Sequence, residues 1–399
     1  MTTTTNNEQK KLNVPNLRFK EFQGEWEKFK LSDLCTFFSG GTPSSSNKDF
    51  YGGDIAFIRS GELHADSTEL FISQDGYDNS SAKMVEIGDL LLAMYGATSG
   101  DIAISKIKGA INQAILCIRT NQNKKFIESV WNKHVSKILR KYLQGGQGNL
   151  SADIVKGISF SFPTLEEQER IANLISLLDE RIATQNKIIE DLKKLKSAII
   201  EKVFNGKHSE KLQLNDVGSY IRGLTYSSND VVEHGGTIVM RSNNIINGSL
   251  LDYNNNVVFV NKQMSAEQQL QNGDVVICMA NGSSSLVGKS SFYDGSCHSP
   301  ITVGAFCGIY RSKEPIVKWL FQTNKYRRYI WNSLQGGNGA IANLNGEDIL
   351  NMSFPIPNAT FKDTCVKMLT SVDSALENNM SLCALYTLQK QHMLRQMFI

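Results

Sequence analysis

The sequence lacks the features that mark several common classes of protein. It has only seven prolines, its seven cysteines are odd in number, and none of them form a Cys-x-x-Cys pair. No run of about 18 apolar residues is present, which excludes an ordinary membrane-spanning helix. Residues 1–11 are polar and lack the apolar stretch of a signal peptide, so we expect a cytoplasmic protein with reduced thiols. The net charge of +3 excludes binding to nucleic acid through gross charge alone and leaves local basic patches open.

Familiar catalytic motifs are also missing or incomplete. Residues 282–290 resemble a phosphate-binding loop, but the glycines are one residue too far apart, so we interpret the segment as a loop between strands. Residues 337–342 match a dinucleotide-binding pattern but follow a predicted helix instead of a strand. Cys297 and His298 are adjacent, with no second cluster of metal-ligand spacing, and no G-x-S-x-G is present. No proline precedes Asp or Pro, which removes the Asn-Pro-Pro-Tyr loop of adenine methyltransferases. We therefore expect a binding protein with no catalytic residue, metal or cofactor of its own.

What the sequence does contain is a duplication. The hexapeptide at residues 143–148, LQGGQG, returns at residues 334–339 as LQGGNG, and Gly88-Asp89 returns as Gly273-Asp274 before a similar apolar run. The lengths agree, because 12–163 and 206–357 each span 152 residues and 164–205 and 358–399 each span 42. We predict a flexible start at 1–11 and then a repeated pair, a 152-residue domain followed by a 42-residue segment.

The two 42-residue segments have the periodicity of long helices. A 4/3 spacing from Ile171 to Val203 meets apolar residues at eight of ten positions, and the same spacing from Cys365 to Met397 meets apolar or aromatic residues at eight of ten. The polar exceptions fall at equivalent places in both segments, which are Gln185 and Asn379, and Lys196 and Lys390. A seam of this length needs a matching seam, so we predict that 164–205 and 358–399 pair as spacer helices. The alternative is a helix that lies alone on its own domain.

The 152-residue segments are expected to mix strands with helices. Short apolar runs bounded by Gly, Asn and Ser predict strands, which we place at residues 55–58, 90–94, 115–118 and 275–279. One helix is predicted before each glycine-rich loop, over about 124–143 and 315–334. The predicted fold class is α+β, a tandem repeat of two α+β domains separated by two long helices.

Several polar and basic residues are candidates for contacts with nucleic acid. The first predicted helix carries lysines four residues apart, and such a stripe next to a loop with Gln or Asn suits phosphates and base edges. Arg59 and Arg241 hold equivalent positions, and arginine fits the N7 and O6 atoms of guanine. The candidates are Ser39, Gly40, Thr42, Ser44, Arg59, Tyr95, Lys133, Lys137, Lys141, Gln144, Gln147, Arg222, Thr225, Arg241, Asn281, Lys325, Arg328, Gln335 and Asn338. A solvated helix face, a surface loop or a structural salt bridge is the ordinary alternative for each.

Three motifs connect the chain to a known family. They are VPNLRFKEF with GEW at residues 14–26, SGGTPS at 39–44, and FPTLEEQERIA at 162–172. With the tandem layout, they resemble the specificity subunit of type I restriction-modification enzymes over nearly the whole chain. The second copy departs from the pattern, because its helix start lacks the Glu-Glu-Gln run and Gly41-Thr42-Pro43 becomes Leu224-Thr225-Tyr226.

The resemblance implies a function and a set of partners. Each 152-residue segment would be a target recognition domain that reads one half of a bipartite, asymmetric double-stranded DNA sequence, and the helices would pair antiparallel and set the spacer. Two methyltransferase subunits would bring S-adenosylmethionine and methylate adenine, and motor-nuclease restriction subunits would use ATP and Mg²⁺. Two other classes stay open from the residues alone: a standalone enzyme with an unrecognised site, and a coiled-coil scaffold without direct DNA readout.

Overall fold

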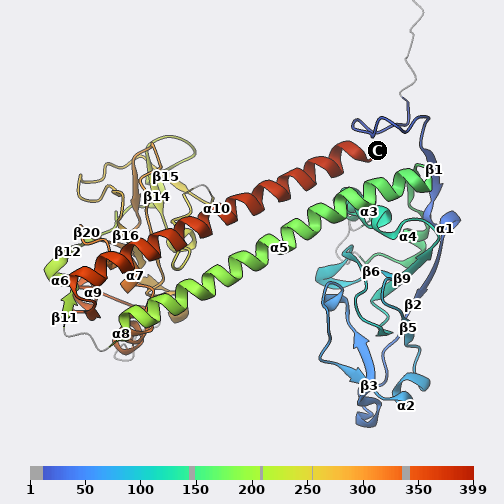
Figure 1. Ribbon diagram of the computed structural model, residues 1–399, viewed down its shortest axis with the longest axis horizontal. Coiled ribbons are helices and arrows are strands. Elements are labelled where there is room, and N and C mark those ends of the chain that lie inside the picture. Colours follow the sequence, from blue (N-terminus) through green and yellow to red (C-terminus); the bar gives the residue numbers. More distant parts are fainter. Residues whose placement is uncertain (1–11, 143–148, 207–209, 254, 335–341) are drawn as a thin grey trace, which may run out of the picture. The chain divides into compact units, whose positions relative to one another are not determined.

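The computed structural model describes residues 12–142, 149–206, 210–253, 255–334 and 342–399. It divides into two compact units, one formed by Met1–Asn186 with Ser381–Ile399 and the other by Lys187–Met380. We call them unit 1 and unit 2. Two long helices, α5 (Leu165–Phe204) and α10 (Ala359–Met397), each belong partly to both units (Figure 1).

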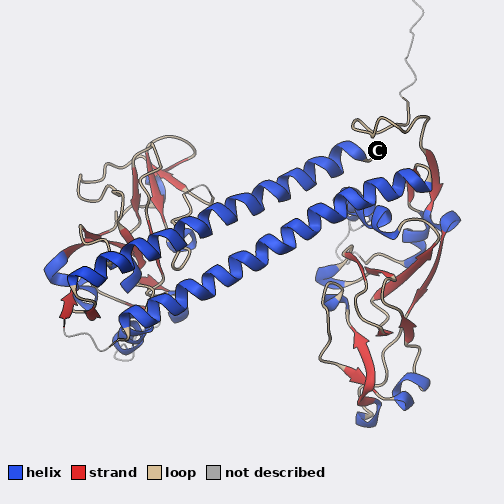
Figure 2. Cartoon of the chain, viewed as in Figure 1, coloured by secondary structure: helices blue, strands red, loops and turns tan. Residues whose placement is uncertain are grey.

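Unit 1 holds two four-stranded sheets and a two-stranded one among its described residues (Figure 2). The first sheet has the order β2-β9-β6-β7, with β2 Cys35–Ser39, β9 Ile115–Thr120, β6 Leu90–Ala93 and β7 Ile102–Ile104. The second has the order β4-β3-β8-β5, with β4 Phe71–Ile72, β3 Tyr51–Ile58, β8 Gly109–Ile111 and β5 Lys83–Val85. Strand β1 (Glu27–Lys30) pairs antiparallel with β10 (Ser159–Phe162).

The first sheet of unit 1 is buried on both faces. Side chains alternate across a strand, so Leu90 and Leu92 point to the core that contains helix α3, whereas Leu91 and Ala93 point to the core shared with the second sheet. This double burial explains why the strand reads as an uninterrupted apolar run. The predicted strands at 55–58, 90–94 and 115–118 correspond to β3, β6 and β9.

Helices α3 and α5 each begin at a side-chain cap in unit 1. Helix α3 (Lys124–Tyr142) follows Asn123, whose side chain accepts a hydrogen bond from the Phe126 N–H at 3.0 Å. Helix α5 follows Thr164, whose hydroxyl accepts from the Glu167 N–H at 3.4 Å. The shorter helices are α1 (Leu31–Leu34), α2 (Gln74–Asp78) and α4 (Ala152–Gly157).

Unit 2 repeats the first sheet of unit 1 and keeps a parallel pair in the second, but the second sheet differs in strand order because its parallel pair lies at one edge of the sheet. Its first sheet has the order β12-β20-β16-β18, with β12 Gly218–Arg222, β20 Cys307–Ser312, β16 Val275–Cys278 and β18 Ser290–Phe292. Its second has the order β13-β15-β14-β19, with β13 Val231–Val232, β15 Val258–Val260, β14 Thr237–Met240 and β19 Ile301–Val303. The parallel pair β14–β19 corresponds to the parallel pair β3–β8 of unit 1. Two-stranded pairs are β11 (Glu210–Gln213) with β22 (Ser353–Ile356), and β17 (Ala280–Asn281) with β21 (Ala342–Asn343).

The predicted helix over 315–334 is wrong as a single element. The structure has two helices there, α7 (Val317–Leu320) and α8 (Asn324–Leu334). Thr323 separates them because its hydroxyl accepts the Tyr326 N–H at 3.1 Å, which starts a new helix at that point. Two further short helices of unit 2 are α6 (Leu214–Val217) and α9 (Gly346–Leu350).

The predicted seams of the long helices are covered in both units. All twenty positions of the two seams are buried or half-buried. In unit 1, Lys390 of α10 reaches Asp179 of α5 at 2.5 Å; in unit 2, Lys196 of α5 reaches Asp373 of α10 at 2.7 Å. These ion pairs are equivalent under the 194-residue repeat, and each joins the two helices side by side and antiparallel within its own unit. The two seam lysines therefore set register through carboxylates on the facing helix.

Each long helix also ends in a hydrophobic core. In unit 1, the Phe398 ring packs with its centroid 5.1 Å from that of Phe126 of α3, and Phe398 lies in one core with Trp26. In unit 2, Phe204 at the end of α5 occupies the matching place in a core with Phe321. The fold class predicted from the sequence is therefore confirmed: two α+β domains with long paired helices. The functional domain boundaries at 12–163, 164–205, 206–357 and 358–399 stay a prediction. Among the described residues, no helix is long and apolar enough to span a bilayer.

Candidate nucleic-acid interface

In unit 1, strand register brings several candidate residues to one end of the first sheet, where β2 and β6 end and β9 begins. We call this end of the sheet its edge. Ser39 at the end of β2 pairs with Leu116, and Ala93 at the end of β6 pairs with Ile115, so Tyr95 emerges at the same edge. Arg59 follows β3, whose last residue lies opposite Ile111, and the Gly41 N–H donates to the Ile111 carbonyl at 3.2 Å. The loops that start at residues 39, 59 and 94 therefore meet at this edge.

The side chains at this edge of unit 1 differ in how free they are. Ser39, Thr42, Ser44 and Tyr95 are exposed, and the Thr42 hydroxyl donates to the Gln113 side chain at 2.5 Å. Gly40 is buried, and an added Cβ would lie 1.7 Å from the Ile111 carbonyl oxygen. This corrects the expectation that Gly40 faces a ligand, because the missing side chain makes room for the neighbouring strand.

Unit 2 assembles an equivalent edge from different side chains. Arg222, the last residue of β12, and Thr225, in the loop that follows, are exposed, and Leu224 bridges to Gly304. The Asn281 amide donates to the Ser242 hydroxyl at 3.2 Å, which connects the end of β17 to the residue after Arg241. Arg222, Arg241 and Asn281 thus lie at one sheet edge, as the sequence repeat predicts.

The two equivalent arginines have different electrostatic surroundings. Arg59 forms an ion pair with Glu62, in which a guanidinium nitrogen lies 2.8 Å from a carboxylate oxygen. This hydrogen-bonded carboxylate raises the pKa of Arg59. At the equivalent third position after Arg241 stands Asn244, which accepts the Arg241 backbone N–H at 2.9 Å but carries no charge. Among the described residues, Arg241 therefore has no carboxylate partner at the edge, whereas the charge of Arg59 is paired with that of Glu62.

The predicted lysine stripe on α3 is divided. Lys137 and Lys141 are exposed, but the Lys133 ammonium donates to the backbone oxygens of Phe398 and Arg395, the latter at 3.3 Å. Burial lowers the pKa of Lys133 and also that of His134, which contacts the Ile399 backbone oxygen at 2.8 Å. The expectation of a continuous DNA-facing stripe is thus corrected, because Lys133 holds the end of α10.

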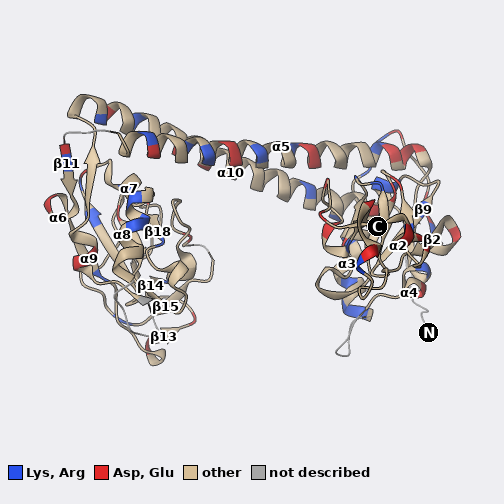
Figure 3. Ribbon diagram, turned by 90° about the horizontal axis from the view of Figure 1, so that it is seen from below, with Lys and Arg blue, Asp and Glu red and all other residues tan. Residues whose placement is uncertain are grey.

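The basic residues of α8 also differ in their exposure to solvent. Lys325 is half-buried, with its ammonium 5.7 Å from the Tyr329 ring and 5.9 Å from the Phe354 ring. Arg328 is exposed, and within the described part of the chain it makes no ion pair. Figure 3 shows lysine and arginine positions on α7 and α8, whereas charges of both signs alternate along α5.

Four candidates, Gln144, Gln147, Gln335 and Asn338, lie outside the described residues. The residues that follow their loops are placed, and they return to the edges already described. The Leu150 N–H donates to the Met94 carbonyl at 2.9 Å in unit 1, and the Leu344 N–H donates to the Met279 carbonyl at 2.8 Å in unit 2.

Two equivalent ion pairs stiffen the sheets behind these edges. Arg119 contacts Asp89 at 2.8 Å in unit 1, and Arg311 contacts Asp274 at 2.7 Å in unit 2. Burial by itself raises the pKa of Asp89, but Arg119 and the backbone N–H of Glu86 lower it overall. Sequence reasoning found the Gly-Asp repeat but missed its partners, because the two arginines are 30 and 37 residues away in the chain.

Sequence reasoning also missed a group of residues in unit 2. Lys289, Arg327 and Trp331 lie around one pocket between α8 and the loop after β17. The available signal was the comparison of the two copies, because the matching stretch of α3 has neither an arginine nor an exposed tryptophan. The loop-between-strands interpretation of residues 282–290 is confirmed, since they connect β17 to the first residue of β18.

The sequence is similar to a known domain family and to several known proteins. Residues 23–194 match the family model of the type I restriction modification DNA specificity domain. The chain is 23% identical over 406 residues to a putative type I restriction enzyme MjaX specificity subunit of Methanocaldococcus jannaschii, covering 92% of this chain and 91% of that one. It is 25% identical over 196 residues to the MjaVIII specificity subunit of the same organism, covering 47% of this chain and only 44% of the relative.

A solved structure agrees in fold. The type I restriction-modification S subunit from M. genitalium superposes with a TM-score of 0.63 at 15% identity, over 97% of this chain and 99% of that one. The duplicated α+β units, the long helices that both units share and these matches agree with one another. Residues 23–194 match the DNA specificity domain of type I restriction-modification systems, and over most of its length the chain is similar to the specificity subunits of such systems.

Proposed function

We propose that this chain is the non-catalytic, DNA-reading subunit of a restriction-modification complex. Each unit reads one half of a bipartite, asymmetric target in double-stranded DNA through the sheet edge described above. Base-edge contacts carry sequence information, whereas phosphate contacts mainly position the protein. The observation that carries the proposal is the pair of equivalent edges with unequal side chains, above all the Arg59–Glu62 pair against Arg241, which meets no carboxylate within the described part of the chain.

The chemistry is assigned to partner subunits. Two methyltransferase subunits with S-adenosylmethionine would modify adenine, and restriction subunits with ATP and Mg²⁺ would translocate and cut DNA. This division agrees with the edges, whose described side chains are hydroxyls, amides and arginines suited to hydrogen bonding with DNA. It also agrees with a location in the cytoplasm, where chromosomal DNA is available.

Methylation sequencing of a host genome with and without this gene tests the function. We expect one split, asymmetric adenine-methylated motif to disappear when the gene is removed and to return when it is restored. An unchanged methylome in a strain with working partner subunits would favour a scaffold without DNA readout. Methylation or cleavage by the purified chain alone would instead favour a standalone enzyme.

The long helices give a second expected result. We propose that their length sets the unread spacer between the half-sites. Seven residues inserted in α5 after Asn186 and seven in α10 after Met380 preserve the 4/3 seam and leave both lysine–aspartate pairs inside their units. Such an insertion adds about 10 Å to each helix, at about 1.5 Å per residue.

We expect the methylated motif of the doubly extended variant to keep both half-sites and to gain about three base pairs of spacer, at about 3.4 Å per pair. Insertion in α5 alone is the control and should destabilise the chain, because the two helices then differ in length. A doubly extended variant that methylates the original spacing would contradict the role of the helices.

A further inference from the structure

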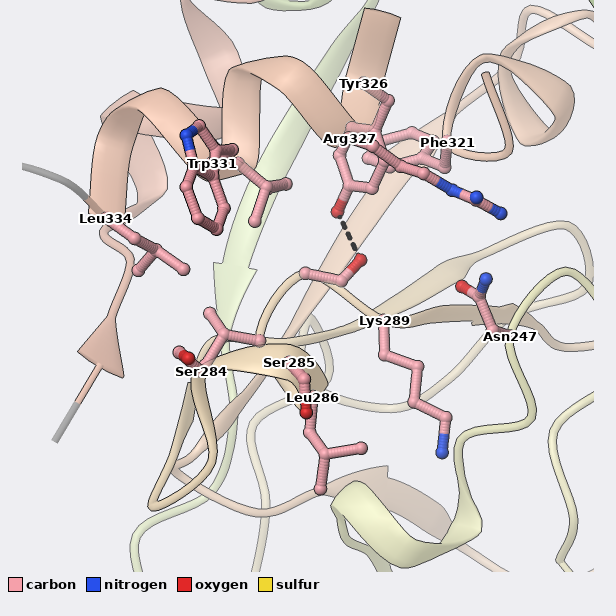
Figure 4. Close-up of a pocket in the computed structure, with 13 residues that line it drawn as sticks. Asn247, Ser284, Ser285, Leu286, Lys289, Phe321, Tyr326, Arg327, Trp331 and Leu334 are labelled. Carbon is pink, nitrogen blue, oxygen red and sulfur yellow. Dashed lines mark hydrogen bonds between the residues drawn. The ribbon is translucent and has the colours of Figure 1, made fainter. Parts of the chain in front are cut away.

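Unit 2 contains a surface pocket of about 440 Å³. The equivalent place in unit 1 has different polar and charged side chains. The pocket opens between α8 and the turn at Ser284–Leu286, and Leu286, Val287 and Ile330 supply its apolar lining. Figure 4 shows Arg327 and Trp331 on the α8 side, and Lys289 on the opposite, loop side.

The loop is held rigidly against α8. Gly288 has φ +80°, and a Cβ there would lie 2.7 Å from the Ile330 side chain. The buried Tyr326 hydroxyl donates to the Gly288 carbonyl at 2.8 Å, the bond dashed in Figure 4. Unit 1 has the same device, in which the Trp131 indole donates to the Gly100 carbonyl at 2.8 Å and Gly100 has φ +88°.

The two copies differ where this shared packing faces solvent. Aligning Trp131 with Tyr326 places Asn132 opposite Arg327 and Ser136 opposite Trp331. Aligning the two glycines places Asp101 opposite Lys289. The packing is retained without the arginine, the tryptophan or the lysine, so the fold does not require them.

The exposed groups of the pocket are available to a ligand. Trp331 is 66% exposed, whereas Trp26, Trp131 and Trp319 are at most 2% exposed. Over the described ranges, neither Arg327 nor Lys289 forms an ion pair. A large, mostly apolar ring and two cations that are unpaired among the described residues lie around one pocket, and this set is complementary to a polyanion that has an apolar component.

The position of the pocket selects the polyanion. Its loop follows directly after Asn281, which bonds Ser242 beside Arg241 at the candidate reading edge. DNA that contacts this edge presents phosphates and deoxyribose rings to the adjoining surface.

We propose that this pocket binds the sugar–phosphate backbone of duplex DNA beside the half-site read by unit 2. Arg327 and Lys289 contact phosphates, and Trp331 packs against a deoxyribose. The inference rests on the proposed function and adds a positioning site that unit 1 lacks. Unit 2 would therefore contribute more of the salt-dependent affinity than unit 1.

Acrylamide quenching of tryptophan fluorescence tests the role of Trp331. Three tryptophans are buried, so quenching in the free chain should come mostly from Trp331 and should fall sharply in Trp331→Phe. A saturating duplex that carries the methylated motif should protect the wild-type chain from quenching. Bound DNA, verified by anisotropy of a labelled duplex, that leaves quenching unchanged would overturn the inference and leave the proposed function standing.

Salt dependence tests the two cations. Each lost phosphate contact should reduce the slope of log affinity against log salt by about 0.9, so Arg327→Gln with Lys289→Gln should reduce it by nearly two. Binding to target and scrambled duplexes should weaken in the same proportion. Lys211→Gln, an exposed lysine on β11 away from the pocket, is the control and should leave the slope unchanged.

A slope unaffected by the double substitution would overturn the phosphate assignment. Wild-type chain that shows no sequence-selective binding to duplex, alone or with its methyltransferase, would instead overturn the proposed function and this inference together.

Discussion

Replacing Asp373 by asparagine is expected to lower the free energy of unfolding of unit 2 by about 3–5 kcal/mol, because it leaves a buried cation without its counter-charge. The Asp373 carboxylate contacts Lys196 at 2.7 Å and Lys318 at 3.1 Å, and it accepts the Trp319 indole N–H at 3.0 Å. The side chains of Asp373 and Lys196 are only 7% and 9% exposed, so water cannot replace the lost charge.

Urea unfolding followed by fluorescence measures this effect, since Trp319 lies against the altered residue. Asp363→Asn, an exposed change on the same helix, is the matched control and should shift stability by less than about 0.5 kcal/mol. Replacing Asp373 and Lys196 together by leucine and methionine should recover most of the loss, because no charge then stays buried. If the free energy of unfolding of the Asp373→Asn chain lay within about 1 kcal/mol of the wild-type value, water would have to reach Lys196 and replace the lost carboxylate.

The equivalent carboxylate in unit 1 should matter less. Asp179 contacts Lys125 at 2.8 Å and Lys390 at 2.5 Å, but its side chain is 29% exposed. Burial raises the pKa of Asp179, yet the two lysines lower it overall. We therefore expect Asp179→Asn to cost less than Asp373→Asn, in proportion to the water that can reach its lysines.

Exchanging residues 12–163 for the recognition domain of another specificity subunit is expected to replace one half-site completely and to leave the other half and the spacer unchanged. Each mismatched base pair in a recognition site costs about 1–3 kcal/mol, so the original half-site should no longer be bound selectively. Methylation sequencing of cells that carry the hybrid measures all three features at once.

The graft must keep the residues that hold the end of α10. These are Trp26 and Phe126, which share a core with Phe398, together with Lys133 and His134, which bind its last backbone oxygens. A hybrid with those four residues altered serves as the control for misfolding. Change in both half-sites of a well-folded hybrid would contradict the assignment of one half-site to each unit.

A companion variant carries the second recognition surface in both positions. Two like readers joined by antiparallel helices should select a target with two-fold symmetry, as symmetric dimers do. An asymmetric motif from that variant would show that the two positions are not equivalent.

The architecture could be predicted from the sequence because its signals are periodic or repeated. A seam with a period of 3.5 residues specifies a long paired helix whatever its partner, and apolar runs buried on both faces specify strands. The break at Thr323 escaped prediction because one hydroxyl cap outweighed a continuous helical pattern around it.

The candidate interface was predictable in outline and not in detail. Arg59 and Arg241 were recognised as equivalent, but the charge of Glu62 against the neutral Asn244 became significant only with the contacts known. The spacing of Lys133 predicted a place in a surface stripe. Its ammonium instead donates to a backbone oxygen just after α10, more than 260 residues away in the chain.

By itself, the sequence determined the duplication, the α+β class, the two long helices and the residues of their seams, since each depends on spacing along the chain. Only the tertiary structure decided which carboxylate each seam lysine meets, why Gly40 has no side chain, and which cations are left for DNA. Those outcomes depend on groups that are distant in sequence and adjacent in space, and charge or burial at one residue is set by neighbours that its own stretch of chain does not contain.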